Sequence, residues 1–502
     1  MDSLRNASAA LAVLTIAVAL SPAFGQPVTA EPAPAPRAAA LVVLDVLVVD
    51  ATGAPVKGLR AGDFEVSQDG APVQVASVVG PGRSRGTRSA SGDPRGQEIL
   101  VVVLVDTFTT TESQRETLLA KSDAVVSNLA WGAGVRVMVA SGGDTVTVRQ
   151  SFTADSRLVV EALKAIESGG EVTSAPGPEA GQAHMAPANL TSFVDLLRGL
   201  PGRKALVYIG ESLPAHLTDA STGVTGDPVR VLADRANAAG VTFYCINMAV
   251  SGRPENGAAV QQLKTVAQGE AVEGGAGKEE SLQSLVLATG GLAVEMSAGV
   301  TNAIANVVRD LKDAYSLSFA APSQGDGAVH QVKVRVRREG TSVRARSAYL
   351  DLKVDDTMAE RTLAALSFGV ADNPLAIQVS ATTESKTGEG AQLATILVSV
   401  PLGNLAFAPR VVSHDCDLGL WLAARDSDGH VIRAPKSKFQ VSVPNDRLLT
   451  ALNQTASYTF KVPLKPGGGT FAVTVRDEIA MQAATELTAL APATEPSPGV
   501  TP

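Results

Sequence analysis

The sequence predicts an α/β protein whose mainly parallel sheet has helices on both faces, flanked by β units and followed by a C-terminal β-sandwich. The Val-rich run Ile99–Val105 is apolar throughout, as in strands that are covered on both faces. Between residues 98 and 320 such runs alternate with helical patterns, which favours right-handed strand–helix–strand crossovers. After Asp356 helical patterns nearly vanish, and short alternating strands are separated by Gly, Asp and Pro turns.

Length and composition limit the function classes. The chain has 502 residues, too many for one ordinary core, so several domains are expected. A hydrophobic content of 45% with 18% charged residues is typical of globular protein. The net charge of -8 and the pI near 5.3 provide no basic surface, so we expect no nucleic-acid partner.

The first residues predict export. Arg5 precedes the apolar run Ala9–Leu20, and small residues lead to Gly25, as in a signal peptide. The run is short for a bilayer span, and no second run of adequate length follows. We therefore expect residues 1–25 to be a signal peptide, and the mature chain to be periplasmic or extracellular without a transmembrane segment.

The remaining chain divides by composition and pattern. Asp69-Gly70 is a hairpin signal between two short strands, which indicates a small β unit before the α/β region. The expected parts are a Pro/Ala-rich spacer (26–40), a small β unit (41–80), a linker (81–97), an α/β domain (98–320), a β-hairpin extension (321–355), a β-sandwich domain (356–483) and a disordered tail (484–502). The strands on both sides of the α/β domain can form one β-sandwich.

Within the α/β domain each expected element follows its own periodicity. The expected strands are Ile99–Val105, Gly134–Ala140, Asp144–Phe152, Arg203–Ile209, Val241–Asn247, Leu292–Met296 and Tyr315–Phe319. The expected helices are Ser113–Leu129, Asp155–Ile166, Leu190–Leu200, Val229–Ala239, Ser281–Ala288 and Val300–Ala314. In the C-terminal region the expected strands are Leu375–Ala381, Leu393–Val400, Leu418–Arg425, Phe439–Val443, Ser457–Val462 and Thr470–Arg476.

A polar turn follows the central strand. Asp106 ends the apolar run, and hydroxyls follow at Thr107 and from Thr109 to Thr111. In open α/β sheets ligands bind beyond the carboxyl ends of the strands, and oxygen ligands suit Mg²⁺ or Ca²⁺. The same residues can instead begin the next helix, because Thr109-x-x-Glu112 and Ser113-x-x-Glu116 fit the capping box. Both interpretations stay open.

Catalytic motifs are absent from the sequence. None of the five His belongs to an H-E-x-x-H motif, and there is no G-x-S-x-G elbow and no P-loop. A Ser/His/Asp site assembled only in space stays open, but we expect no enzyme. The run His414-Asp415-Cys416-Asp417 contains types of residue that bind metals, but adjacent residues of a strand point to opposite faces, so we expect a turn with an incidental His here. Pairing of Cys245 with Cys416 is left open.

The order of strand, Asp106, hydroxyl turn and helix, followed by L-P-G-R-K-A-L-V-Y-I-G-E, resembles a von Willebrand factor type A (VWFA) domain. More narrowly, the chain resembles VWFA-related proteins of the Acidobacteria type from Leu41 to Tyr349. This narrower resemblance rests on three stretches: V-L-V-V-D-A-T-G-A-P-V-K-G-L-R-A-G-D-F-E-V-S-Q-D-G, L-P-G-R-K, and A-T-G-G-L-A-V with L-K-D-A-Y-S-L-S-F.

The resemblance implies a Rossmann-like sheet that binds other proteins, often through a metal ion held by a D-x-S-x-S turn. Asp106 matches its first position and Thr110 its last, Phe108 replaces the first Ser, and Glu211 takes the place of a later acidic ligand. It implies a degenerate adhesion site for Mg²⁺ or another divalent cation, completed by a partner's acidic side chain. The alternatives are a metal-free structural scaffold of the cell envelope and, less favoured, a hydrolase with an unrecognised site.

Overall fold

The computed structural model describes residues 41–81, 99–120, 134–143, 145–167, 187–211, 213, 217–218, 225–247, 278–295, 300–322, 325–384, 392–465 and 467–490. These residues form two compact units, 41–360 and 361–490, each treated by itself. No helix in this described part of the chain is long and apolar enough to cross a membrane. The predicted signal peptide, spacer and linker lie almost wholly outside the described residues.

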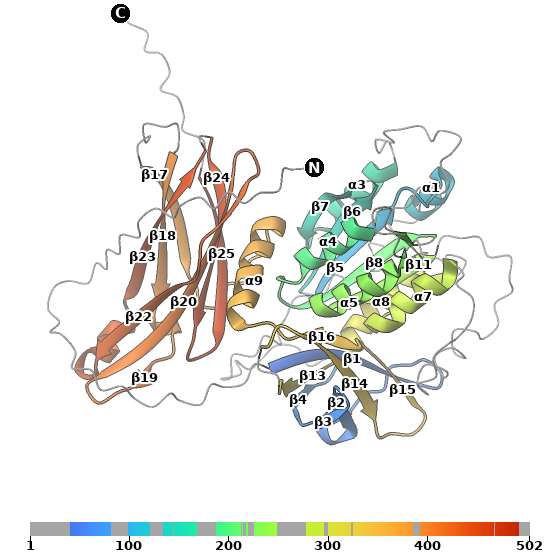
Figure 1. Cartoon of the computed structure of the whole chain (residues 1–502), viewed down its shortest axis with the longest axis horizontal. Coiled ribbons are helices and arrows are strands. Elements are labelled where there is room, and N and C mark those ends of the chain that lie inside the picture. The colour runs from blue at the N-terminus through green and yellow to red at the C-terminus, as the bar shows by residue number, and fades with distance from the viewer. Residues whose placement is uncertain are drawn as a thin grey trace, which may run out of the picture. The chain divides into compact units, whose positions relative to one another are not determined.

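A six-stranded sheet forms the centre of the first unit (Figure 1). Its order is β12-β11-β8-β5-β6-β7, and all neighbours are parallel except β6 and β7. The strands are β5 (Ile99–Asp106), β6 (Val135–Gly142), β7 (Val146–Thr153), β8 (Arg203–Gly210), β11 (Val241–Asn247) and β12 (Ala293–Glu295). A short two-stranded pair, β9 (Leu217–Thr218) and β10 (Thr225–Gly226), lies between β8 and β11 in the chain.

Helices cover both faces of this sheet because β5 is apolar at every position up to Val105. Val101, Val103 and Val105 pack with α3 (Ser156–Glu167) and α8 (Val300–Asp313) on one face. Successive strand residues point to opposite faces, so Leu104 lies on the other. The helices on that side are α4 (Pro187–Leu197), α5 (Pro228–Ala239) and α7 (Lys278–Thr289), while α1 (Glu112–Ala120) contacts α3 (Figure 1).

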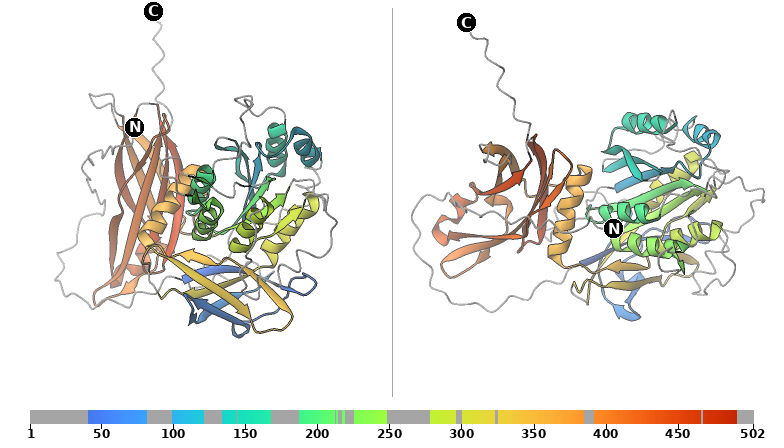
Figure 2. Two further views of the ribbon diagram at one scale, coloured as in Figure 1. Left: turned by 45° about the vertical axis from the view of Figure 1, so that its right-hand side comes forward. Right: turned by 45° about the horizontal axis from the view of Figure 1, so that its top comes forward.

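Strands from both ends of the α/β region build the β unit beside it. Two four-stranded sheets, β15-β1-β13-β4 and β16-β14-β2-β3, share one core with Leu44, Phe64 and Phe319. In both views of Figure 2 the blue strands of residues 41–79 lie among the gold strands of residues 315–350. The strands are β1 (Leu41–Asp50), β2 (Phe64–Gln68), β3 (Ala71–Val73), β4 (Val75–Val79), β13 (Tyr315–Ala320), β14 (Val329–Val336), β15 (Thr341–Ala345) and β16 (Ala348–Leu350).

Charged side chains join this β unit to the central sheet. Arg344 of β15 forms an ion pair with Asp310 of α8, and both side chains are more than nine-tenths buried. Burial raises the pKa of Asp310 even with Arg344 beside it. At the start of β8, Arg203 contacts the carboxylate of Asp45 at 2.9 Å. A buried pair such as Arg344 and Asp310 is costly to break, so it fixes how the β unit lies against the sheet.

The second unit contains two antiparallel sheets that share one core. Ile396 and Val398 of the first sheet belong to the same buried cluster as Leu420, Phe471 and Val473 of the second. The first sheet consists of β17 (Gln378–Glu384), β18 (Gln392–Pro401) and β23 (Thr455–Leu464). The second consists of β19 (Ala408–Pro409), β20 (Ser413–Asp426), β21 (Val431–Arg433), β22 (Ser437–Pro444), β24 (Gly469–Asp477) and β25 (Gln482–Leu490).

Two predicted boundaries are wrong. The region expected to be all β from residue 356 begins with α9 (Val354–Phe368), whose first turn carries Asp355 and Asp356 and whose later turns are rich in helix-favouring Ala and Leu. The tail expected to be disordered from residue 484 starts within β25, which pairs with β24 along its whole length. The predicted helix Ser113–Leu129 is described only as far as Ala120, and residues 491–502 also lie outside the described residues.

The buried pair of Arg344 and Asp310 gives a test of this packing. We expect Arg344→Met to lower the free energy of unfolding by about 3–5 kcal/mol, because it leaves the Asp310 carboxylate buried and unpaired. The double variant Arg344→Met/Asp310→Leu removes both charges and should recover most of that loss. Urea unfolding of the chain measures both. A single variant as stable as the wild type would show that the pair does not hold the two parts together.

Candidate functional site

The strand order of the central sheet reverses direction beside β5. From β5 the chain adds β6 and β7 on one side, and then continues with β8, β11 and β12 on the other. The loops after β5 and β8 therefore leave in opposite directions, and we call the region between the carboxyl ends of these two strands the crevice, because open α/β sheets bind ligands at this position. Asp106 ends β5, and Gly210 ends β8 directly before Glu211. The predicted site residues belong to this crevice.

Asp106 is fully buried, and both of its carboxylate oxygens accept hydrogen bonds. Oδ1 accepts from the backbone N–H groups of Phe108 at 2.8 Å and Thr109 at 3.2 Å, which closes a turn typical of Asp. Oδ2 accepts from the hydroxyl of Tyr208. An unpaired buried carboxylate would be costly, so these three donors make Asp106 compatible with the core.

The hydroxyls that follow Asp106 bind backbone atoms. Thr107 Oγ1 donates to the carbonyl of Gly142 at 2.6 Å, which ties the turn to β6. Thr110 is buried, and its hydroxyl donates to the carbonyl of Asp106. Thr109 Oγ1 accepts from the N–H of Glu211 at 3.2 Å. These contacts hold the end of β5 against both of its neighbours.

Helix α1 begins with a capping box formed by Thr111 and Gln114, and not by the predicted pairs that begin at Thr109 or Ser113. The N–H of Thr111 donates to Gln114 Oε1 at 2.7 Å, and the N–H of Gln114 donates back to Thr111 Oγ1 at 3.3 Å. Gln114 also donates through Nε2 to Glu211 Oε1 at 2.7 Å. The structure thus brings Asp106 and Thr110 together and joins Glu211 to their turn through Thr109 and Gln114.

Tyr208 is the site residue that sequence reasoning missed. It is fully buried, and β8 aligns it with Leu104 of β5, on the face toward which Asp106 also points. Burial, followed by the neighbouring Asp106 charge, raises the pKa of Tyr208 far above its usual range, so the phenol stays protonated and donates. The sequence could have indicated this residue, because Tyr208 lies in an otherwise aliphatic run and a buried Tyr hydroxyl needs a hydrogen-bond partner.

Gly210 is required by this close packing. A Cβ at this position would lie 2.8 Å from the Tyr208 hydroxyl and 2.9 Å from Thr109 Oγ1, closer than carbon and oxygen tolerate. Any larger residue would therefore push the Tyr208 hydroxyl away from Asp106 or displace the turn.

The hydrogen bonds of this turn already use the groups expected to bind the predicted cation. Mg²⁺ needs several oxygen ligands in near-octahedral positions. Here the Asp106 oxygens already accept three hydrogen bonds, the Thr110 hydroxyl is directed to a backbone carbonyl, and Phe108 offers no oxygen. An ion at Asp106 Oδ2 would compete with the Tyr208 hydroxyl for this oxygen. The Phe108 side chain is 37% exposed, so it does not fill the core in place of a ligand.

Comparisons with known proteins identify no family. No protein-family model and no curated protein matches the chain. The solved structures that are similar include a von Willebrand factor type A protein from Catenulispora acidiphila, at 10% identity and a TM-score of 0.27, covering 89% of this chain and 71% of that one. BatB from Bacteroides thetaiotaomicron is 13% identical with a TM-score of 0.25, covering 42% of this chain and 98% of that one. The proximal thread matrix protein 1 of the mussel byssus, solved with a zinc-occupied MIDAS motif, is 8% identical with a TM-score of 0.28, covering 45% of this chain and 48% of that one. Similarity this low does not assign a function.

The hydrogen bond from Tyr208 to Asp106 can be tested by removing one atom. We expect Tyr208→Phe to lower the free energy of unfolding by about 1.5–3 kcal/mol, because it deprives a buried charged acceptor of its donor. Tyr349→Phe is the matched control, since its hydroxyl donates at 2.7 Å to the neutral amide oxygen of Gln68 and should cost only about 1 kcal/mol. Equal losses in urea unfolding would show that the Asp106 charge gives the bond no added strength.

Proposed function

We propose that this chain is an exported, VWFA-like module that binds another protein at the crevice between β5 and β8. The observation that supports this most is the reversal of strand order at these strands, the position where open α/β sheets bind ligands. The proposal includes the finer expectations from the sequence: a Rossmann-like central domain, a C-terminal β-sandwich, the resemblance to the Acidobacteria type, and a periplasmic or extracellular location.

The surface around the crevice has the composition of an interface. Phe108 is partly exposed at the centre of the turn, and Thr111, Glu112 and Glu116 are exposed beside it. An aromatic side chain within a polar rim is typical of positions that contribute strongly to protein binding. The carboxylates of Glu112, Glu116 and Glu211 favour a partner segment that carries basic residues.

Binding without an ion agrees best with the hydrogen bonds of Asp106 and Thr110. The predicted Mg²⁺ site of Asp106, Thr110 and Glu211 stays a prediction, and the scaffold alternative differs from it in needing no cation. The hydrolase alternative has least support, because the described histidines lie in β14, in β20 and after β20, outside the central sheet. His184 and His216 lie outside the described residues.

A charge reversal tests the crevice as the binding surface. We expect Glu211→Lys to reduce the amount of partner captured from an envelope extract by about tenfold or more, because it places a cation beside a basic partner. Glu161→Lys makes the same change on the exposed side of α3, away from the crevice, and should capture as much as the wild type. Quantitative mass spectrometry of the captured proteins gives the comparison, and equal capture by both variants would contradict the proposal.

The role of a cation is tested in the same assay. We expect chelator to leave capture unchanged, and Mg²⁺ to leave the melting temperature unchanged in wild type and in Asp106→Ala. A bound ion would raise stability by mass action, by about 2.7 kcal/mol at a hundredfold excess over its dissociation constant. Capture that requires Mg²⁺, together with a Mg²⁺-dependent melting shift that Asp106→Ala abolishes, would restore the adhesion-site interpretation.

A further inference from the structure

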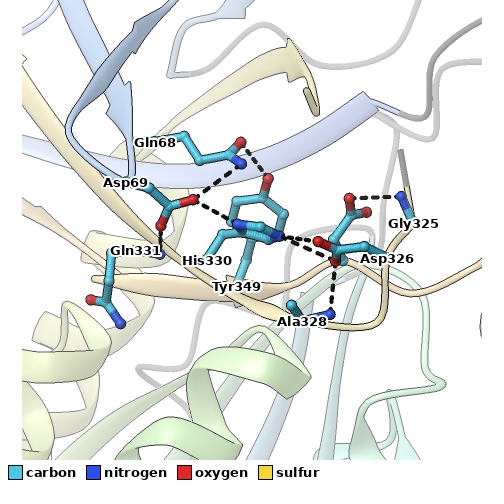
Figure 3. A network of polar contacts seen from close by, with 9 residues as sticks. Gln68, Asp69, Gly325, Asp326, Ala328, His330, Gln331 and Tyr349 are labelled. Carbon is cyan, nitrogen blue, oxygen red and sulfur yellow. Dashed lines mark hydrogen bonds and ion pairs between the residues drawn. The ribbon is translucent and has the colours of Figure 1, made fainter. Parts of the chain in front are cut away.

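A second group of polar residues lies in the β unit, away from the crevice. His330 at the start of β14 lies between two carboxylates, Asp69 from the turn between β2 and β3, and Asp326 from the loop before β14 (Figure 3). Asp351 directly follows β16. Asp326, His330 and Asp351 each have one nitrogen or oxygen atom that could bind a metal, and these three atoms lie within 4.8 Å of one another. These residues meet because β14 pairs with both β2 and β16.

The two nitrogens of His330 have different neighbours. Nδ1 lies 2.7 Å from Asp69 Oδ2, whereas Nε2 lies 3.2 Å from both oxygens of Asp326. A carboxylate only accepts, so Nδ1 carries a proton toward Asp69, and Nε2 is the atom that faces Asp326. Histidines that bind metals almost always have their second nitrogen bound in this manner, which fixes the ring and strengthens the ligand.

Asp69 is itself held in place. Its Oδ1 accepts from the N–H of Gln331 at 2.9 Å, and Gln68 Nε2 lies 3.5 Å from its Oδ2. The Tyr349 hydroxyl donates to Gln68 Oε1, and the Tyr349 ring lies beside the His330 ring (Figure 3). The hydrogen bond is 2.7 Å long, and the ring centres are 5.6 Å apart. The orientation of His330 thus depends on a chain of contacts that extends into the core.

The backbone also fixes Asp326 relative to Asp351. Oδ2 of Asp351 accepts from the N–H of Gly325 at 2.8 Å, and Oδ1 of Asp326 accepts from the N–H of Ala328 at 2.8 Å. Backbone hydrogen bonds then join Gly327 and Ala328 to Asp351 at 2.8 and 3.0 Å. Asp351 is 5% exposed, while the Asp326 side chain is 42% exposed, so one end of the group is in the core and the other reaches solvent.

We propose that Asp326, His330 and Asp351 bind a first-row divalent transition ion such as Zn²⁺ or Mn²⁺, with Asp69 positioning His330. One imidazole nitrogen with two carboxylates suits such ions better than Ca²⁺ or Mg²⁺, which prefer oxygen ligands alone. Two ligands at about 2.0 Å from Zn²⁺ in a tetrahedron are about 3.3 Å apart, close to the distance of 3.2 Å between Nε2 and Asp326. The exposed side leaves room for water as a further ligand.

The competing explanation is an ion pair without metal. Both nitrogens of His330 face carboxylates, and the hydrogen bond with Asp69, with a smaller contribution from Asp326, raises the pKa of His330. An imidazolium between Asp69 and Asp326 would then hold the β2–β3 turn to β14. An ion would replace the proton on Nε2 and draw in Asp351, which the ion pair does not need.

Titration calorimetry of the mature, untagged chain with ZnCl₂ and MnCl₂ tests the site. We expect one ion per chain, an affinity at least about tenfold weaker in His330→Gln and Asp351→Asn, and a loss of about 10- to 100-fold in Asp69→Asn. His414→Gln removes a histidine of β20 whose Nδ1 contacts Asn445, and should bind like the wild type. Thermal unfolding without metal checks that each variant folds.

The outcomes separate this site from the crevice. Binding that survives Asp106→Ala but is lost in His330→Gln and Asp351→Asn supports the proposal, whatever the partner capture shows. Binding lost in His330→Gln but retained in Asp351→Asn shows that Asp351 is not a ligand and overturns the proposed site. Failure of the wild type to bind Zn²⁺ or Mn²⁺ also overturns it.

Discussion

The central sheet depends on satisfying one buried carboxylate at the end of its most apolar strand. Asp106 is fully buried, and burial of a charge is tolerated only when hydrogen bonds replace the lost water. The replacement comes from two directions, from the amides of the following turn and from the Tyr208 hydroxyl on the neighbouring strand. The turn geometry, the strand register and the glycine at position 210 therefore depend on one another, because all three are needed to bring the same three hydrogen-bond donors to Asp106.

The β unit meets the sheet under a similar constraint. Asp310 and Arg344 are both buried, and they belong to α8 and β15, which are separated along the chain by β13 and β14. Arg203 reaches Asp45 of β1 and, at 3.2 Å, the carbonyl of Ala314. Such contacts contribute little net free energy but are costly to break, so they favour one arrangement of the β unit over others.

Much of the local structure is predictable because it follows from periodicity. The run Ile99–Val105 is confirmed as β5, and the strands expected around Leu206 and Phe243 are confirmed as β8 and β11. The mixed α/β class with several sheets is likewise confirmed. α9 was missed because its hydrophobic residues follow no clear helical stripe, and β25 because its alanines resemble the composition of a disordered tail.

The sites were less predictable than the fold, since side-chain partners depend on pairing between distant segments. Asp106 and Thr110 could be selected from one turn, but Tyr208, whose hydroxyl donates to Asp106, lies on another strand. The local sequence around His330 did not indicate a site there, because Asp69 lies beside His330 only through the pairing of β2 with β14. The same long-range pairing that closes the β unit also brings an imidazole and carboxylates together at one point, far in sequence from the turn after β5.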